Sequence, residues 1–309
     1  MAAKAAVGVL GLGIMGGAFA RHLLEAGFKV VGYDVRRPAV TAFKRLGGAP
    51  ALSAADLAGR VPVLITSLPS IKAFEMAFFG IEGIAASALM GTIVIEASTL
   101  PLAVKERAQR RLASYGIVLL DCPISGTGAQ AAAKDAVVYA SGPKVAIARC
   151  AKVFKGFARA YHDCGAFGAG SKLKFVANLL VTIHNLSAAE AMVLGEKSGV
   201  DLRLLQKVIA DGAGTSRMFE VRGPLMSAGR YDKATMKLDV YQKDIAIIRA
   251  HARMLKCPTP LFGASLRYYT RALKQGRAKQ DTAAVHAVLR QEARLVGKPG
   301  GKPGARRQK

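Results

Sequence analysis

Short β-branched runs alternate with helix-length segments over the first 164 residues of the chain, and the alternation then stops. Alternation of this kind predicts a mostly parallel β-sheet that is covered by helices on both faces. The stop near Cys164 predicts a domain boundary, because a chain of 309 residues is long enough for two domains. The predicted strands are Val7 to Leu10, Lys29 to Tyr33, Val61 to Ser67, Thr92 to Glu96, Ile117 to Asp121 and Ala136 to Ser141.

From Ser171 onward the apolar residues recur only with helical spacing, which predicts an all-α second domain. We expect an α/β domain over residues 1–164 and the all-α domain over residues 165–296. The glycine-rich junction at 165–170 predicts a flexible approach to a long helix, with a cleft beside it. Residues 297–309 are rich in glycine, proline and basic residues, so we expect a disordered basic tail. The predicted helices cover residues 171–198, 201–212, 238–256, 260–275 and 281–295.

The charge balance is strongly basic, with 45 Lys and Arg residues against 20 Asp and Glu and a formal net charge of +25. Hydrophobic residues make up 51% of the chain, which is ordinary globular usage and excludes the disordered and collagen-like classes. The positive excess bears on solubility, anionic ligands or contact with polyanions. No basic-aromatic recognition motif accompanies it, so we expect nucleic acid to bind only non-specifically, if at all.

Two further features of the sequence indicate where in the cell the protein is found and whether it binds a metal. The apolar run from Ala5 to Ala20 is short and interrupted by glycines, whereas a membrane-spanning helix needs about 20 apolar residues, so we expect no membrane attachment. The cysteines show no C-x-x-C spacing, which favours reduced thiols in the cytoplasm over a disulfide framework or a zinc site. They are Cys122, Cys150, Cys164 and Cys257.

A glycine-rich turn stands between the first predicted strand and the helix that follows it, with the sequence Gly11-Leu12-Gly13-Ile14-Met15-Gly16. In this context a G-x-G-x-x-G pattern predicts dinucleotide binding, and all six residues are candidate cofactor contacts. Gly11 permits the tight turn and Gly13 lets backbone N–H groups approach a pyrophosphate. Gly16 lets the helix pack closely on the strand. The first domain is therefore predicted to be a Rossmann domain.

Asp34 ends the second predicted strand, 23 residues after Gly11. A carboxylate at this distance accepts hydrogen bonds from the adenosine ribose hydroxyls, and it repels a 2′-phosphate. This favours NAD over NADP. Arg36 and Arg37 follow closely, so NADP stays possible.

Lys174, Asn178 and Asn185 lie at positions i, i+4 and i+11 of the long predicted helix, within about 40° of one another around its axis. Taken alone, such a polar stripe is more often a solvated helix face. The Gly168-x-Gly170 entry to the helix favours a functional stripe beside the cleft.

The motifs occur in an order that resembles the β-hydroxyacid dehydrogenase family over about residues 5–290. The Gly11–Gly16 turn resembles the family's G-L-G-x-M-G loop, and Ser67-Leu68-Pro69 resembles its loop after a central strand. Four other segments carry the resemblance: residues 96–101 (D-x-S-T-x-x-P, with Glu96 for Asp and Pro101 one place early), residues 121–127 (D-x-P-V-S-G-G, with Thr127 for the second glycine), residues 168–178 (G-x-G-x-x-x-K-x-x-N-N, with Ala177 for the first asparagine) and Lys243-Asp244. A further glycine of the family is replaced by Lys134.

The resemblance implies an NAD(P)-dependent oxidoreductase that interconverts a small 3-hydroxy acid and its semialdehyde or keto acid by hydride transfer. In that family Lys174 would be the general acid/base and Asn178 would orient it and the substrate oxygen. Ser125, Gly126 and Thr127 would hold the substrate carboxylate, and Lys243 would reach the nicotinamide and the substrate. Along the cofactor would lie Ser67, Leu68, Pro69 and Thr99.

The resemblance also implies a homodimer or homotetramer built through the helical domain. An imine reductase-like enzyme of the same architecture stays open, although that branch usually lacks the lysine at position 174. 6-Phosphogluconate dehydrogenase is a more distant alternative, because the chain is short for it and lacks a histidine between Lys174 and Asn178. From a different class, a cofactor-bound basic scaffold that binds nucleic acid stays open because of the charge.

Overall fold

The computed structural model describes residues 6–297 and 299. The chain forms two compact units that divide between Phe175 and Val176, inside the long helix α8 (Ala169–Lys197). The boundary predicted after Cys164 lies in the loop that leads into this helix. The predicted basic tail lies outside the described residues, apart from Gly297 and Pro299.

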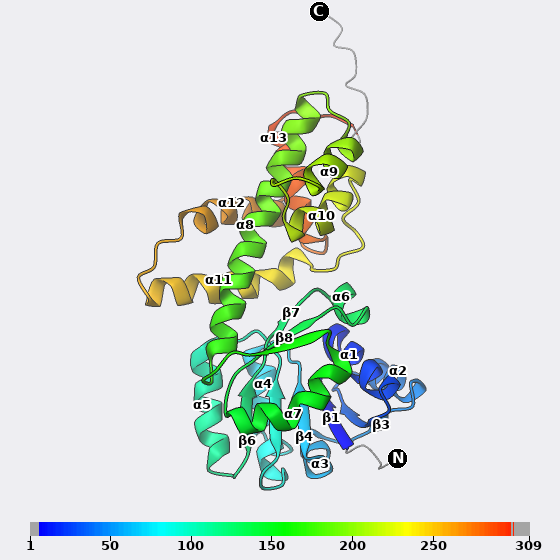
Figure 1. Ribbon diagram of the computed structural model, residues 1–309, viewed down its shortest axis with the longest axis vertical. Helices are drawn as coiled ribbons and strands as arrows, with labels where there is room; N and C mark the ends of the chain where they lie inside the picture. Colours follow the sequence, from blue (N-terminus) through cyan, green and yellow to red (C-terminus); the bar gives the residue numbers. More distant parts are fainter. Residues whose placement is uncertain (1–5, 298, 300–309) are drawn as a thin grey trace, which may run out of the picture. The chain divides into compact units, whose positions relative to one another are not determined.

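The first unit contains a six-stranded parallel sheet with the strand order β3-β2-β1-β4-β5-β6, and helices cover both of its faces (Figure 1). The predicted α/β class with a mostly parallel sheet is confirmed. The strands are β1 (Ala6–Leu10), β2 (Lys29–Tyr33), β3 (Ala49–Pro50), β4 (Val63–Thr66), β5 (Ile93–Glu96) and β6 (Val118–Asp121). The helices between them are α1 (Ile14–Glu25), α2 (Arg37–Arg45), α3 (Ala54–Gly59), α4 (Ile71–Phe79), η1 (Ile84–Ala86) and α5 (Leu102–Ala113).

A small second sheet follows β6 in the same unit, with the order β7-β8-β9. Its members are β7 (Ile124–Ser125), β8 (Val137–Ala140) and β9 (Ala160–Asp163), and α6 (Gly128–Ala132) and α7 (Lys144–Phe157) lie between them. The sequence does not predict β3, β7 or β9. Strands β3 and β7 have two residues each, which is too short for a period-2 pattern, and β9 has the sequence Ala-Tyr-His-Asp, which contains no apolar run.

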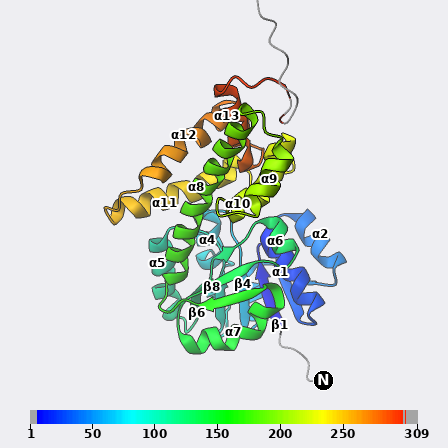
Figure 2. The same ribbon diagram turned by 45° about the horizontal axis from the view of Figure 1, so that its top comes forward.

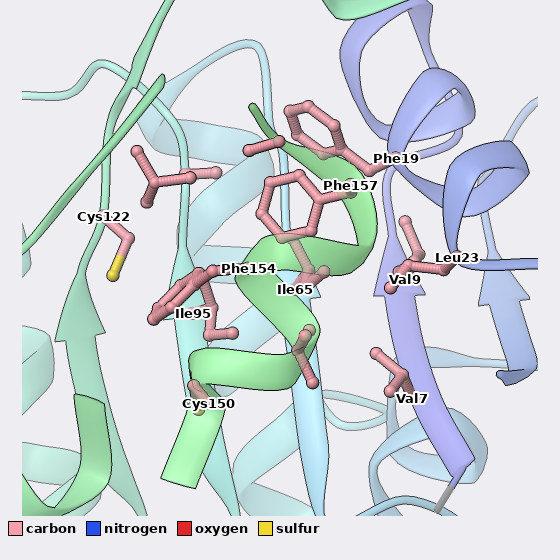
Figure 3. Packing of buried hydrophobic residues seen from close by; sticks show 14 of the residues in the cluster. Val7, Val9, Phe19, Leu23, Ile65, Ile95, Cys122, Cys150, Phe154 and Phe157 are labelled. Carbon is pink, nitrogen blue, oxygen red and sulfur yellow. The ribbon is translucent and has the colours of Figure 1, made fainter. Parts of the chain in front are cut away.

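Apolar side chains of the central strands pack under two helices, as Figure 3 shows. Val9 and Ile65 are fully buried and lie beneath Phe19 of α1 and Phe157 of α7, whose rings are 4.6 Å apart. A second buried cluster covers the other face of the sheet. Burial on both faces explains why these strands have continuous apolar sequences. Polar side chains that could bind a ligand are therefore found in the loops at the strand ends.

The second unit is helical, which confirms the predicted all-α class; Figure 2 shows its helices around α8. Hydrogen bonds from Thr182 to Tyr241 and from Asn185 to Tyr269 join α8 to α11 and α12. The sequence does not predict α10, because Gly223 and Pro224 interrupt its periodicity. The helices after α8 are α9 (Leu202–Ala210), α10 (Arg217–Ala228), α11 (Leu238–Met254), α12 (Pro260–Lys274), η2 (Thr282–Ala284) and α13 (Val285–Glu292).

Within the described part of the chain, α8 alone is long and apolar enough to cross a membrane, judged by length and composition only. Thr182 and Asn185 of this helix are fully buried and hydrogen-bonded to neighbouring helices. Buried polar groups that pair with other helices are typical of a core helix, so α8 is the central helix of the second unit.

Lys134 adopts a left-handed backbone conformation with φ of 58° just after α6, at a position where the family that the sequence resembles has glycine. A residue with a Cβ is strained there, so Lys134→Gly should raise the free energy of unfolding by about 0.5–1 kcal/mol. Lys134→Ala keeps the Cβ and is the matched control, with no gain expected. Denaturant unfolding of the three proteins checks this, and a glycine variant no more stable than the alanine variant would contradict it.

Candidate functional site

The loops after β1 and β4 meet where the strand order of the large sheet reverses, which is where open α/β sheets bind ligands. Gly11 has φ of +90°, and a Cβ on it would lie 2.3 Å from the carbonyl oxygen of Ser67. A Cβ on Gly16 would lie 1.8 Å from the carbonyl oxygen of Gly11. A Cβ at either position would clash with the backbone, so only glycine fits at positions 11 and 16. At Gly13, the N-cap of α1, a Cβ would meet only the Arg36 guanidinium at 3.5 Å, so this N-terminus is open to an anion.

Asp34 follows β2 and its carboxylate is nearly covered. Oδ2 accepts a hydrogen bond from the backbone N–H of Leu12 at 2.8 Å. The Arg36 guanidinium pairs with both oxygens, at 3.1 Å each, and the Arg36 N–H donates to Oδ1 at 2.8 Å. Partial burial would raise the pKa of Asp34, but the Arg36 and Leu12 hydrogen bonds outweigh it and lower the pKa. The carboxylate therefore stays ionised at the edge of the glycine-rich loop.

The loop that holds Ser67, Leu68 and Pro69 is tied to the segment after β5. The N–H of Leu68 donates to Ser98 Oγ at 2.8 Å, and the N–H of Ser98 donates to Glu96 Oε1 at 2.8 Å. Thr99 is the next residue along. The structure thus brings the predicted cofactor residues 67–69 beside both Gly11 and the segment that contains Thr99.

The predicted substrate loop lies next to the glycine-rich loop. Ser125 ends β7, Gly126 has φ of +142°, and Thr127 is the N-cap of α6. A Cβ on Gly128 would lie 2.5 Å from Cγ2 of Ile14, so this loop and the N-terminus of α1 are in direct contact. The two groups of residues that the sequence predicts to bind cofactor and substrate are therefore neighbours in the first unit.

Thr127 forms a capping box with Gln130. Its N–H donates to Gln130 Oε1 at 2.9 Å, and its hydroxyl oxygen accepts from the Gln130 N–H at 3.4 Å. A substrate carboxylate that uses the Thr127 N–H would have to replace the Gln130 side chain. Within residues 6–297 no acceptor takes the hydrogen of the Thr127 hydroxyl, so that hydrogen can be donated to a ligand.

The sequence does not predict a buried charged cluster made by Glu96, Lys105 and Asp121, all of which are fully buried. Lys105 Nζ lies 2.8 Å from Asp121 Oδ1 and 3.8 Å from Glu96 Oε1. Burial would lower the pKa of Lys105, but the Asp121 and Glu96 carboxylates outweigh it and raise the pKa. The available signal was Lys105 itself, a lysine three residues before Ala108 and seven before Leu112 on the buried face of α5.

The start of α8 is anchored to this cluster. Ser171 donates from its N–H to Asp121 Oδ2 and from its hydroxyl to Asp121 Oδ1, each at 2.7 Å. The N–H of Gly170 donates to Ser141 Oγ at 3.0 Å, and a Cβ on Gly170 would lie 2.4 Å from the carbonyl oxygen of Tyr139. The sequence predicts a flexible approach here, but the structure gives Gly170 a different role, which is close packing of the helix end on the sheet.

Lys174 and Asn178 follow on α8, one turn apart, and both side chains are buried. In the second unit, Asn178 Nδ2 donates to Asp244 Oδ2 at 3.0 Å, and Lys243 Nζ lies 3.5 Å from Asp244 Oδ1. Asp244 thus brings together the predicted residues Asn178 and Lys243. Asn185 instead donates to Tyr269 and to the carbonyl of Thr282 inside the helical core, so it has a structural role.

Comparison with known proteins identifies the family. Residues 6–168 match the NAD-binding domain of 6-phosphogluconate dehydrogenase, and residues 168–289 match the NAD-binding domain of NADP-dependent 3-hydroxyisobutyrate dehydrogenase. The chain is 38% identical to L-threonate dehydrogenase of Cupriavidus necator over 284 residues, which cover 92% of this chain and 95% of that protein. The chain belongs to the β-hydroxyacid dehydrogenase family. It is therefore an NAD(P)-dependent oxidoreductase, as the sequence predicts.

Solved structures of the β-hydroxyacid dehydrogenase family agree with this assignment. A crystal structure of 3-hydroxyisobutyrate dehydrogenase from Salmonella typhimurium has a TM-score of 0.83 and 31% identity, and it covers 92% of this chain and 100% of its own. An imine reductase from a Pseudomonas species has a TM-score of 0.60 and 21% identity, with 93% and 99% covered, and shares the fold alone. Of the two enzyme readings, hydroxyacid dehydrogenase is the better supported.

Proposed function

We propose that the chain interconverts a small 3-hydroxy acid and its semialdehyde or keto acid, with NAD as the preferred cofactor. When bound, the cofactor supplies the hydride chemistry. The protein has to hold a carboxylate, orient the reacting carbon and move a proton on or off the oxygen. Lys174 is the proton carrier, and Asn178, held by Asp244, orients it and the substrate oxygen. Lys243 adds positive potential.

A polyhydroxy acid such as L-threonate is the first substrate to test. Ser125 and the Gly126 and Thr127 amides grip the carboxylate in this proposal. The observation that carries the choice is the Thr127 hydroxyl, which accepts from Gln130 and keeps a hydrogen to donate where the family has glycine. A second hydroxyl on the substrate would pair with it, and a site built for a hydroxyl disfavours analogues that lack one. The relative with 38% identity is named for L-threonate.

The test is a matrix of NAD and NADP against L-threonate, glycerate, 3-hydroxyisobutyrate and 4-hydroxybutyrate. We expect the largest kcat/KM with NAD and L-threonate. Thr127→Gly should shift the preference toward 3-hydroxyisobutyrate, whereas Thr127→Ser keeps the hydroxyl and should retain the original order. A wild-type enzyme that prefers 3-hydroxyisobutyrate to L-threonate would contradict the substrate proposal. Turnover on none of the four acids would contradict the proposal that the chain interconverts a 3-hydroxy acid and its semialdehyde or keto acid.

Asp34→Ala should reduce the preference for NAD, measured as the ratio of kcat/KM for NAD to that for NADP, by about tenfold. The change removes the carboxylate that repels a 2′-phosphate and frees Arg36 from its two contacts at 3.1 Å. One such charge interaction of about 1.4 kcal/mol corresponds to tenfold. Asp56→Ala is the matched control, since Asp56 pairs with Arg60 on α3 away from the glycine-rich loop. A clear NADP preference in the wild-type enzyme would make Arg36 a phosphate ligand instead.

We also propose a cytoplasmic homodimer or homotetramer built through the helical unit. The support is the exposed apolar side chains of Leu180 and Leu194 on α8 and the free state of all four cysteines. Light scattering of the purified protein measures the subunit number, and a monomer at micromolar concentration would contradict the proposal.

A further inference from the structure

Three charged side chains lie in the interior of the first unit, beside the candidate site, and their burial has to be explained. Glu96, Lys105 and Asp121 are fully buried, and removing each ion from water costs several kcal/mol. Apolar replacements for such clusters are often neutral or stabilising, so a buried ion cluster is weak evidence for stability. Two carboxylates also outnumber the single lysine. Asp121 also accepts from the N–H of Ser171 in the first turn of α8.

One end of the cluster holds the first turn of α8. Asp121 accepts from both the N–H and the hydroxyl of Ser171 at 2.7 Å. The hydroxyl of Ser141 lies 3.0 Å from the backbone carbonyl oxygen of Asp121 and 3.2 Å from Asp121 Oδ2, and it accepts from the N–H of Gly170 at 3.0 Å. Lys174 lies three residues after Ser171, which is slightly less than one helical turn, or about 4.5 Å along the axis. The position of this turn therefore sets the position of the Lys174 backbone.

The other end of the cluster holds the loops predicted to lie along the cofactor. Glu96 accepts from the Thr66 hydroxyl and, at 2.8 Å, from the N–H of Ser98. Ser98 Oγ in turn accepts from the N–H of Leu68 at 2.8 Å. Glu96 thus fixes the end of β4, the segment after β5 and the Ser67-Leu68-Pro69 loop.

Lys105 lies between the two ends, 3.8 Å from Glu96 and 2.8 Å from Asp121. We propose that the Glu96–Lys105–Asp121 cluster positions the helical turn that carries Lys174 relative to the cofactor-side loop at 67–69. Lys105 and its two partners are positioning residues that act through Ser171 and Ser98. The inference rests on the proposed role of Lys174 as proton carrier.

Ser171→Ala is the smallest change at the helix end. It removes one donor to Asp121 and leaves the backbone contact in place. We expect the rate constant for hydride transfer in a single turnover, followed by the absorbance of reduced nicotinamide, to fall about 10- to 100-fold, because small misplacements of reacting groups have effects of this size. The dissociation constant of the cofactor should change less than twofold. A purely structural defect would lower the amplitude of the turnover and leave its rate constant unchanged.

Ser53→Ala is the matched control. Ser53 is also buried and caps α3 by accepting from the N–H of Asp56 at 3.1 Å. The Ser53→Ala enzyme loses one hydrogen bond, as Ser171→Ala does, but this bond lies outside the Glu96–Lys105–Asp121 cluster. Its single-turnover rate constant should therefore equal that of the wild type. Ser98→Ala tests the other end, where we expect the cofactor dissociation constant to rise about threefold or more. Lys105→Met should show both defects.

A Ser171→Ala enzyme with a rate constant within twofold of the wild type would overturn the inference. A Ser53→Ala enzyme whose single-turnover rate constant falls as far as that of Ser171→Ala would also overturn it. Lys174→Ala measured beside them separates this inference from the proposed function. An active Lys174→Ala enzyme would remove the proposed proton carrier and the inference with it. An inactive Lys174→Ala beside a fully active Ser171→Ala would remove the inference alone.

Discussion

Replacing Lys174 with alanine should lower kcat by about 10²- to 10⁴-fold on the best substrate of the matrix, the range expected for the loss of a general acid/base. Cofactor affinity should change little, because the glycine-rich loop that begins at Gly11 belongs to other elements of the chain. Steady-state kinetics and a fluorescence titration with NADH measure the two effects separately.

Two other lysine variants make the result specific. Lys174→Arg should not restore turnover, since a guanidinium does not release its proton near neutral pH. Lys172 is exposed and only two residues away on the same helix, so Lys172→Ala should keep wild-type kcat. A Lys174→Ala enzyme that retained most of its turnover would show that another group carries the proton.

Local patterns predicted the geometry of the glycine-rich turn between β1 and α1, because the contact that requires glycine at position 16 lies within a short stretch of chain. The close approach of Gly16 to the carbonyl of Gly11 spans a single turn between β1 and α1, and spacing alone reveals it. Asp34 is similar, since its position after β2 follows from the length of one strand-helix-strand unit.

Long-range contacts between polar groups could not be predicted in the same way. Lys105 is separated from Asp121 by 16 residues and Asp121 from Ser171 by 50, so no periodicity in the sequence connects them. Thr127 looked like a substrate ligand alone, yet its backbone N–H is used in a capping box with Gln130. Helix α10 was missed because its buried residues Met218, Phe219 and Met226 stabilise a segment whose own propensity is poor.

The helical unit contains a buried histidine that should make it sensitive to acid. His286 is fully buried, and its Nδ1 lies 2.9 Å from the hydroxyl of Tyr231. Burial lowers the pKa of His286 to about 4, with Arg290 acting in the same direction and Glu196 opposing it. Arg290 and Glu196 pair at 2.7 Å, so a proton on His286 would add a second cation beside an arginine that is already paired.

Acidification from pH 7 to pH 4 should therefore cost about 3 kcal/mol of unfolding free energy through His286 alone. The unfolded chain takes up a proton below its ordinary pKa of about 6.5, while the folded chain resists until about 4, so stability is complete above 6.5 and falls across this window. Denaturant unfolding at pH 7, 6, 5 and 4 measures the slope.

His286→Phe cannot titrate and should flatten the slope by about 1.4 kcal/mol per pH unit, although it starts from a lower stability because Tyr231 loses its partner. His162→Phe, at an exposed position on β9, is the control and should keep the wild-type slope. Equal slopes for His286→Phe and the wild type would mean that His286 gains its proton at the same pH in the folded and unfolded chain, contrary to its burial.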